Sequence, residues 1–208
     1  MTLKLVYFNI PFWRAETSRL ALHLGGVPFE DVRPNREEFR QLKASGTLPY
    51  GQLPVLHIDG FVLAQSAAIA RYCGQVSGHY PKDPIEAVRV DELLDTANQI
   101  SGLISPSMRA KDAETKLQMR TQLAQDSLPQ WFTFLSQRLD ANAASPFFVG
   151  TSMTVADLAI WRLLDWLTSG TLDGLPKTLL EPFPTLAAHH AHIGSHPKIQ
   201  AWMAQYAR

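Results

Sequence analysis

The sequence predicts a small α/β domain in residues 1–80 followed by an all-helical domain in residues 85–208. Up to about residue 78, short apolar β-prone runs alternate with segments of helical spacing. Beyond that point, every segment with a clear period has helical spacing. Pro81 and Pro84 stand close together between the two regions, so we expect the linker there.

The first domain is expected to have the order β-α-β-α-β-β-α. Its predicted strands and helices, in chain order, cover residues 3–8, 14–24, 27–33, 36–44, 55–58, 61–63 and 66–76. Gly25-Gly26 ends the first helix and Ser45-Gly46 ends the second. Asp59-Gly60 lies between two apolar runs, which is typical of a hairpin because both turn residues need positive φ.

The second domain shows no strand-like alternation and no internal repeat. Its helical periods cover residues 85–108, 113–139, 154–167 and 197–206. Thr154 is the expected N-cap of the third of these, with Asp157 reaching back to it and Met153 packing on Leu158. This pattern predicts a stabilising helix start, and we expect no catalytic role for Asp157.

The overall composition excludes several classes of protein. Lys+Arg and Asp+Glu both number 19, so the formal net charge is zero and we expect no nucleic-acid partner. No apolar run approaches the roughly 18 residues of a membrane helix, and the N-terminus has no signal-peptide pattern. Cys73 is the only cysteine and cannot form an internal disulfide, which fits a reducing compartment. We therefore expect a cytoplasmic protein.

Three positions in the first domain have two interpretations each. Pro54 begins a strand, either as a simple turn or as a cis proline that exposes the backbone of Leu53 to an extended ligand. Ser66 is a good N-cap, and the free N–H groups behind it also suit a carboxylate. Tyr7 ends the first strand, where it either packs in the core or hydrogen-bonds a thiolate.

Together these residues resemble a known family. Residues 3–78 are similar to the thioredoxin-like domain of cytosolic glutathione transferases, and Gly150–Asp157 resembles the family's G-x-S-x-T-x-A-D capping box. The first resemblance rests on Tyr7-Phe8-Asn9, Arg14-Ala15-Glu16 with Arg19-Leu20, Glu30-Asp31-Val32-Arg33, Gly51-Gln52-Leu53-Pro54-Val55-Leu56, Asp59-Gly60 and Gln65-Ser66-Ala67-Ala68-Ile69-Ala70-Arg71-Tyr72. The sigma class, which includes haematopoietic prostaglandin D synthases, is the most similar, and residues 48–54 also resemble the pi class.

The resemblance implies a glutathione site in the first domain, with acceptor and dimer contacts from the second. In it, Tyr7 stabilises the glutathione thiolate and Arg14 supports it, and these two are the expected catalytic residues. Lys43 binds the glycine carboxylate, and Leu53, before a cis Pro54, pairs with the cysteinyl unit. The full expected glutathione-binding set is Tyr7, Arg14, Phe39, Lys43, Gln52, Leu53, Pro54, Gln65 and Ser66, the last two holding the γ-glutamyl carboxylate.

Three departures from the family pattern affect this site. Phe39 replaces a tryptophan and cannot donate a hydrogen bond, so we expect weaker glutathione binding. The family's arginine-glycine-arginine loop becomes Pro11-Phe12-Trp13-Arg14, which is one residue longer. Asn98 and Gln99 stand where the family often has acids facing the neighbouring subunit's glutathione.

The acceptor site is the least defined part of the sequence. The expected lining residues are Phe8, Ile10, Phe12, Trp13, Ile104, Ser105 and Met108, although an apolar helical stripe is also typical of a core. We expect no metal and no cofactor besides glutathione as co-substrate. The three residues His189, His192 and His196 are expected on a solvated helical face rather than at a zinc ion.

The resemblance implies a homodimeric glutathione transferase that joins the thiolate to small hydrophobic electrophiles. Tyr50 is the expected aromatic residue that inserts into the neighbouring subunit. The first alternative is a glutathione-dependent isomerase or peroxidase, although Pro106 stands where prostaglandin-isomerising members have an aromatic residue. The second is a non-catalytic ligand-binding or structural member of the fold.

Overall fold

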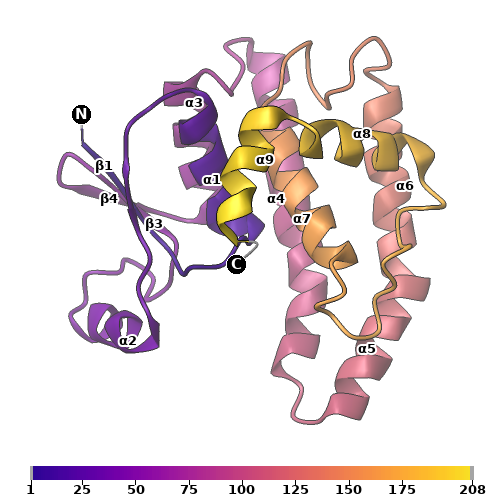
Figure 1. Cartoon of the computed structure of the whole chain (residues 1–208), viewed down its shortest axis with the longest axis horizontal. Coiled ribbons are helices and arrows are strands. Elements are labelled where there is room, and N and C mark those ends of the chain that lie inside the picture. The colour runs from indigo at the N-terminus through magenta and orange to yellow at the C-terminus, as the bar shows by residue number, and fades with distance from the viewer. Residues whose placement is uncertain (1, 207–208) are drawn as a thin grey trace.

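A computed structural model describes residues 2–206 of the chain. Figure 1 shows a sheet-containing half beside a larger helical half. The predicted domain ranges begin at Met1 and end at Arg208, and these two residues lie outside the described part, as does Ala207.

The first half has the predicted order of strands and helices. Its elements are β1 (Leu3–Val6), α1 (Trp13–Leu24), β2 (Glu30–Val32), α2 (Arg36–Ala44), β3 (Val55–Ile58), β4 (Phe61–Ala64) and α3 (Ser66–Ser77). The strand order is β2-β1-β3-β4, with β1 parallel to β2 and the other pairs antiparallel. Asp59 and Gly60 have φ values of 46° and 92°, which confirms the predicted hairpin turn.

The two faces of the sheet are covered by different helices. Along β1, Leu3 and Leu5 belong to the main core with residues of α1 and α3. Val6 points to the other face, where it shares a small cluster with Phe39 and Leu42 of α2. This alternation follows from the two-residue period of a strand. As a result, Tyr7, the first residue after β1, packs in the main core on the side of α1.

The second half is helical throughout its regular structure. Its elements are α4 (Pro84–Arg109), α5 (Ala113–Gln125), α6 (Ser127–Asp140), α7 (Val155–Thr168), α8 (Pro184–Gly194), α9 (Pro197–Met203) and the 3₁₀ turn η1 (Ala204–Tyr206). Among the described residues, no helix is long and apolar enough to cross a membrane.

The prediction of one continuous helix over residues 113–139 is wrong. The chain leaves helical geometry at Asp126, whose φ and ψ are −112° and −74°, and this residue separates α5 from α6. Pro129 explains the break, because it lacks the N–H that would bond the carbonyl of Gln125 in a continuous helix. In the first turn of a new helix, this missing donor costs nothing.

The capping box of α7 is confirmed and takes a further partner. The Thr154 side chain accepts from Ala156 N–H, and Asp157 Oδ2 accepts from Thr154 N–H at 2.7 Å. Asp157 Oδ1 accepts from Phe148 N–H at 2.9 Å and lies 3.0 Å from His189 Nε2. The expectation that His189 lies on a solvated face is therefore wrong, since it is buried against a carboxylate.

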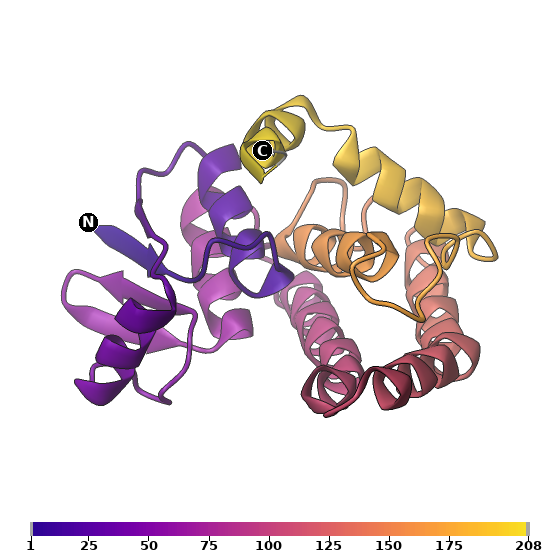
Figure 2. The ribbon, with the colours of Figure 1, turned by 60° about the horizontal axis from the view of Figure 1, so that its bottom comes forward.

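The two halves pack through α1 and α3 on one side and α4 and α7 on the other. Figure 2 shows α9 returning from the helical half to lie beside α1. His196 caps α9 rather than continuing α8, so the three histidines predicted on one face belong to two helices.

Candidate active site

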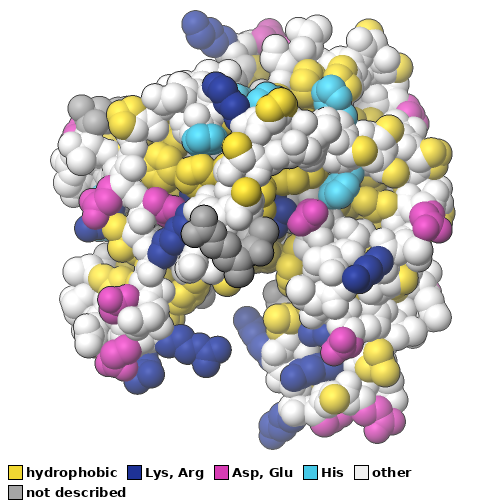
Figure 3. Space-filling model, viewed as in Figure 1, with side chains coloured by type: hydrophobic (Ala, Val, Ile, Leu, Met, Phe, Trp, Pro, Cys, Tyr) yellow, Lys and Arg dark blue, Asp and Glu magenta, His cyan; other side chains and the backbone are white. Residues whose placement is uncertain are grey.

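A cavity of about 620 Å³ lies between the two halves. Figure 3 shows the molecule deeply notched between the α2 side and the end of α4 and α5. The lining residues come from the loop after β1, from α1, from α4 and from the end of α7. They are Tyr7, Phe8, Ile10, Pro11, Phe12, Arg14, Ser101, Ser105, Met108, Arg162, Asp165, Trp166, Ser169 and Thr171.

Tyr7 reaches this cavity from the end of β1. Its backbone N–H bonds the Val32 carbonyl at 3.0 Å, which continues the β1–β2 ladder by one residue. Burial raises the pKa of Tyr7 to about 12, against the opposing charges of Arg14 and Arg19. The hydroxyl therefore stays protonated at neutral pH. Among residues 2–206, nothing hydrogen-bonds this hydroxyl, so it remains available as a donor to a ligand.

Arg14, in the first turn of α1, is a half-buried cation beside Tyr7. Its Nη1 donates to Asn98 Oδ1 on α4 at 3.1 Å, which bridges the two halves within one chain. The guanidinium also lies over the rings of Phe12 and Trp13, at 5.9 Å and 5.4 Å. Burial lowers the pKa of Arg14 from its usual value, and these partners hold the group in place.

Arg14 also lines a second, narrow slot of about 30 Å³. Its lining residues are Arg14, Tyr50, Gln52, Leu53, Pro54, Ala64, Gln65 and Ser66. The Leu53–Pro54 peptide bond is cis, as the resemblance implied. Leu53 lies beyond Val55, the residue that forms the last β3–β4 pair.

The start of α3 forms the other wall of the slot. Gln65, not Ser66, is the N-cap, so the predicted cap is wrong by one residue. Gln65 has φ of 75°, and no side chain caps the helix. Ser66 is instead the first helical residue and is buried. The uncapped N–H groups and the positive end of the helix dipole therefore face the slot, where an anion is favoured.

The two predicted site residues of α2 lie outside both cavities. Phe39 packs edge-on against Phe8, with ring centroids 5.2 Å apart. Lys43 is exposed in the last turn of α2, and its side chain passes over Gly51. Neither residue lines the slot or the large cavity.

The loop of residues 11–13 is fastened to the helical half. Arg162 on α7 donates to the Pro11 carbonyl through Nε at 3.2 Å and also through Nη2, while its Nη1 bonds Asp165 at 2.6 Å. Trp13 is fully buried, and its Nε1 donates to Ser101 Oγ on α4 at 2.7 Å. Phe12 is left facing the cavity, with its ring 4.8 Å from that of Trp166.

Comparison with known proteins identifies the family. The family description "Glutathione S-transferase, N-terminal domain" matches residues 3–75, and "Glutathione S-transferase, C-terminal domain" matches residues 98–206. This chain belongs to the glutathione S-transferase family. All the residues that line the slot and the large cavity therefore lie within the two matched regions.

Individual relatives agree over almost the whole length. Glutathione S-transferase 1 of Ascaris suum is 36% identical over 97% of this chain and 95% of its own. Hematopoietic prostaglandin D synthase of Gallus gallus is 31% identical over 96% and 94%. The crystal structure of the glutathione S-transferase from Ascaris lumbricoides superimposes with a TM-score of 0.83 at 34% identity, covering 99% of this chain and 97% of that one.

The fold brings most of the predicted site residues of this glutathione S-transferase together. Tyr7 and Arg14 meet at the junction of slot and cavity, and the slot gathers the predicted residues from the cis-proline turn and the α3 start. The cavity is lined by the predicted Phe8, Ile10, Phe12, Ser105 and Met108. Trp13 and Ile104 lie instead in the core, each fully buried, and do not line it.

Seven lining residues were not in the predicted sets: Arg162, Asp165, Trp166, Ser169, Thr171, Pro11 and Ser101. The available signal was the spacing within α7, since the first three recur at helical intervals beside an apolar face. The sequence could not show that this polar face turns toward the loop after β1.

Other reactive groups in the described residues offer no competing site. No group of three or more potential ligands within residues 2–206 could hold a metal ion. Burial raises the pKa of the Cys73 thiol to about 12, so this thiol stays protonated in the core.

Proposed function

We propose that this glutathione S-transferase transfers the glutathione thiolate to small hydrophobic electrophiles, with Tyr7 and Arg14 activating the thiol. The observation that carries the proposal is the junction of two unlike cavities at Arg14, beside Tyr7. The slot offers backbone groups and a helix N-terminus, which suit a peptide with free carboxylates. The cavity offers aromatic and apolar side chains, which suit an apolar acceptor.

Thiol activation follows from the state of Tyr7. A hydroxyl with a pKa of about 12 remains a donor at neutral pH, and a hydrogen bond to a thiolate favours the ionised form. The Arg14 cation adds attraction for the same charge. Since these groups lower the thiol pKa of the co-substrate, the enzyme needs no cysteine nucleophile of its own.

The slot positions glutathione through groups that point into it. In this proposal the Leu53 backbone pairs with the cysteinyl unit, and the α3 start with Gln65 and Ser66 holds the γ-glutamyl carboxylate. Lys43 reaches the glycine carboxylate from α2. Phe39 contributes apolar contact, and Gln52 lines the same slot.

A binding and turnover experiment tests the function. Isothermal titration with glutathione is expected to show one site per chain, and a chlorinated nitrobenzene is expected to be conjugated with loss of free thiol. If the protein binds no glutathione, every hypothesis of a glutathione-dependent enzyme is wrong. If it binds glutathione and turns over substrates without consuming it, the isomerase alternative replaces conjugation.

The second candidate is a glutathione-dependent isomerase or peroxidase. It is supported by prostaglandin D synthases among the relatives, such as that of Nilaparvata lugens, whose structure matches with a TM-score of 0.84 at 30% identity. Pro106 within α4 argues against prostaglandin isomerisation, because that activity in the family goes with an aromatic residue nearby. A non-catalytic member of the fold is the third candidate.

We also propose that the enzyme is closest to the sigma class, with pi-like features in residues 48–54. The motif Tyr7-Phe8-Asn9 and the similarity to prostaglandin D synthases support the first part. The single buried thiol of Cys73 and a thiol co-substrate support a place in the cytoplasm, where thiols stay reduced.

The proposed active form is a homodimer in which Tyr50 inserts into the neighbouring subunit. Tyr50 lines the slot and is 66% exposed, so its ring is accessible to a second copy of the chain. A groove between α4 and α6 of about 300 Å³, in which Leu93, Trp131 and the exposed Phe134 lie among polar residues such as Thr96, offers aromatic contacts for Tyr50 on the second copy. Tyr50→Ala is expected to shift the protein toward monomer in sedimentation at low micromolar concentration. An unchanged dimer would remove Tyr50 from this role.

A further inference from the structure

A buried network of charges lies directly behind the thiol-activating tyrosine. Its centre is Arg19 of α1, whose side chain is fully buried. Arg19 Nη2 donates to the carbonyl oxygens of Tyr7 and Phe8, at 3.2 Å and 3.3 Å, and the guanidinium lies 5.9 Å from the centre of the Tyr7 ring. Arg19 thus binds the backbone segment that carries the Tyr7 side chain.

Two carboxylates fix Arg19 in that position. Its Nη1 bonds Glu16 Oε2 at 3.1 Å, and its Nε bonds Asp31 Oδ1 at 2.9 Å. Burial lowers the pKa of Arg19, but the charges of Glu16 and Asp31 outweigh that effect and leave it above the ordinary value. The guanidinium is therefore a permanent cation whose orientation depends on its two acids.

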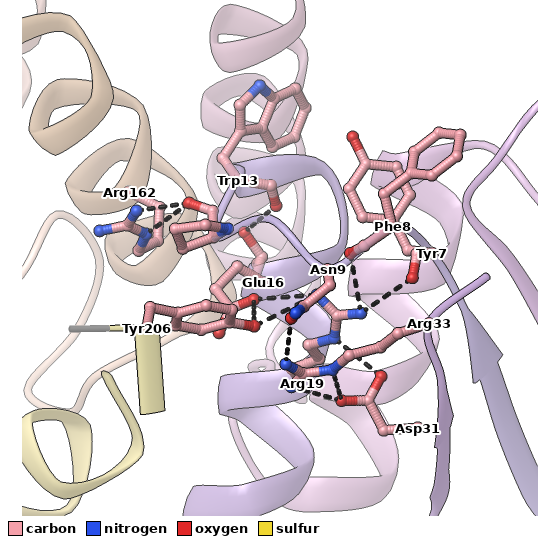
Figure 4. A network of polar contacts seen from close by, with 12 residues as sticks. Tyr7, Phe8, Asn9, Trp13, Glu16, Arg19, Asp31, Arg33, Arg162 and Tyr206 are labelled. Atoms are coloured by element: carbon pink, nitrogen blue, oxygen red, sulfur yellow. Dashed lines mark hydrogen bonds and ion pairs between the residues drawn. The ribbon is translucent and has the colours of Figure 1, made fainter. Parts of the chain in front are cut away.

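The C-terminal segment supplies the remaining partners of Glu16, which is itself fully buried. Trp202 Nε1 donates to Glu16 Oε1 at 2.5 Å, and the Tyr206 hydroxyl donates to Glu16 Oε2 at 2.9 Å. Both oxygens of the carboxylate are thus occupied by residues almost 190 positions away in the chain. Figure 4 shows Arg19 between Tyr206 on one side and Tyr7 with Phe8 on the other.

Arg33 connects the same segment to the loop after β1. It pairs with Asp31 at 2.7 Å, bonds Asn9 Oδ1 at 2.7 Å and Gln205 Oε1 at 2.9 Å. Its guanidinium also lies 5.2 Å from the ring of Tyr206. The C-terminal segment is therefore linked to the Tyr7–Asn9 turn in two ways: through Glu16 and Arg19, and through Arg33.

We propose that Tyr206 and Trp202 are positioning residues for thiol activation: through Glu16 and Arg19 they fix the backbone of Tyr7 and Phe8, and so the direction of the Tyr7 hydroxyl. Neither residue lines the cavity or the slot, so each acts only through the network. The inference rests on the proposed function, in which Tyr7 donates to the glutathione thiolate. It adds the C-terminal segment to the groups that set the thiol pKa.

The variants Tyr206→Phe and Trp202→Phe remove one hydrogen bond each and keep an aromatic ring in place. The readout is the thiol pKa of bound glutathione, followed by the ultraviolet absorbance of the thiolate as pH rises. Loss of one hydrogen bond of ordinary strength is expected to raise that pKa by about half a unit to one unit. At neutral pH kcat is expected to fall about fivefold and to recover at alkaline pH, with the KM for the acceptor unchanged.

Tyr80→Phe is the matched control. The Tyr80 hydroxyl also donates to a carboxylate, Asp91 Oδ1, at 2.9 Å, and neither residue bonds Glu16, Arg19 or the loop after β1 in the described part of the chain. We expect this variant to lose stability like Tyr206→Phe and to keep the thiol pKa of the wild type. A raised pKa in Tyr206→Phe and Trp202→Phe, but not in Tyr80→Phe, supports the positioning role.

Three results overturn the inference, and they differ in what else they remove. An unchanged thiol pKa in Tyr206→Phe and Trp202→Phe, with a wild type that conjugates glutathione, removes the positioning role alone. An equal rise in Tyr80→Phe shows general loosening of the fold and also removes it. A wild type that does not bind glutathione removes the proposed function, and the positioning role falls with it.

Discussion

The glutathione slot and the acceptor cavity meet at Arg14, yet they are built in different ways. Apart from Arg14, the slot is formed by two short segments of the first half: the cis Leu53–Pro54 turn with its neighbours and the uncapped start of α3 at Gln65. The cavity is formed by side chains from four separate segments, among them Phe12, Met108 and Trp166. The shape of the slot depends on the backbone conformation of two short segments, whereas the cavity combines side chains from four segments that can vary independently. We therefore expect the slot to fix one co-substrate and the cavity to set the range of acceptors.

The largest effect is expected at the junction, because Arg14 lines both sides. Arg14→Met removes the cation beside the thiolate and the bond to Asn98, so kcat/KM is expected to fall about 100-fold. Steady-state kinetics with each substrate varied in turn measures the change. Arg71→Met is the control, since it also removes an ion pair, to Asp91, and Arg71 lines neither cavity. Equal losses in the two variants would contradict a special role for Arg14.

The slot alone is tested by Ser66→Ala at the α3 start. The variant removes a buried hydroxyl from the proposed carboxylate site, so the KM for glutathione is expected to rise about tenfold. The KM for the acceptor is expected to stay the same. Ser77→Ala, at the other end of α3, is the control and leaves both constants unchanged. A rise in both KM values of Ser66→Ala would show that slot and cavity are not separate.

The cavity alone is tested by Trp166→Leu on α7. Loss of the ring that packs on Phe12 is expected to raise the KM for an aromatic acceptor about fivefold, without changing glutathione affinity. Phe147→Leu removes an aromatic ring that packs on His192, away from the cavity, and serves as control. Titration calorimetry for glutathione and kinetics for the acceptor give the two numbers. Weaker glutathione binding in Trp166→Leu would contradict the assignment of glutathione to the slot and of the acceptor to the cavity.

The smallest effect on activity is expected at Cys73, which is buried on the core side of α3 and lines neither site. Cys73→Ala is expected to keep full activity. Because the thiol pKa is raised from 9.0 to about 12 in the folded chain, the unfolded chain loses this proton first as pH rises. Stability should therefore fall from about pH 9 upward, and more steeply in the wild type than in Cys73→Ala. Urea unfolding at neutral and alkaline pH measures this, and equal slopes would contradict it.

The contrast between the slot and the cavity also explains which features the sequence predicts well and which it does not. The order of elements around the slot follows from local signals: the Asp59-Gly60 turn, the Gly25-Gly26 stop and the strand-initiating Pro54. The N-cap at Gln65 was missed because its positive φ has no signature in a glutamine. Trp13 was expected in the cavity, but Ser101 of α4, which no local pattern connects to it, bonds its indole in the core.

The helical half shows the same limit on a larger scale. The break at Asp126 depends on one missing donor at Pro129, which a count of apolar spacing overlooks. Arg162 lies in a correctly predicted helix, yet its bond to the Pro11 carbonyl joins segments 151 positions apart. The sequence shows which residues share a helix face, but only the packing of α7 against α1 shows what that face meets.

The central claim is that Tyr7 lowers the thiol pKa of bound glutathione by donating a hydrogen bond. The most direct measurement is the thiolate absorbance of glutathione bound to the wild type and to Tyr7→Phe, followed over pH. The account predicts a bound-thiol pKa more than one unit below the ordinary value of about 8.5 in the wild type, and a return toward that value in Tyr7→Phe. The same low pKa in both proteins would contradict it.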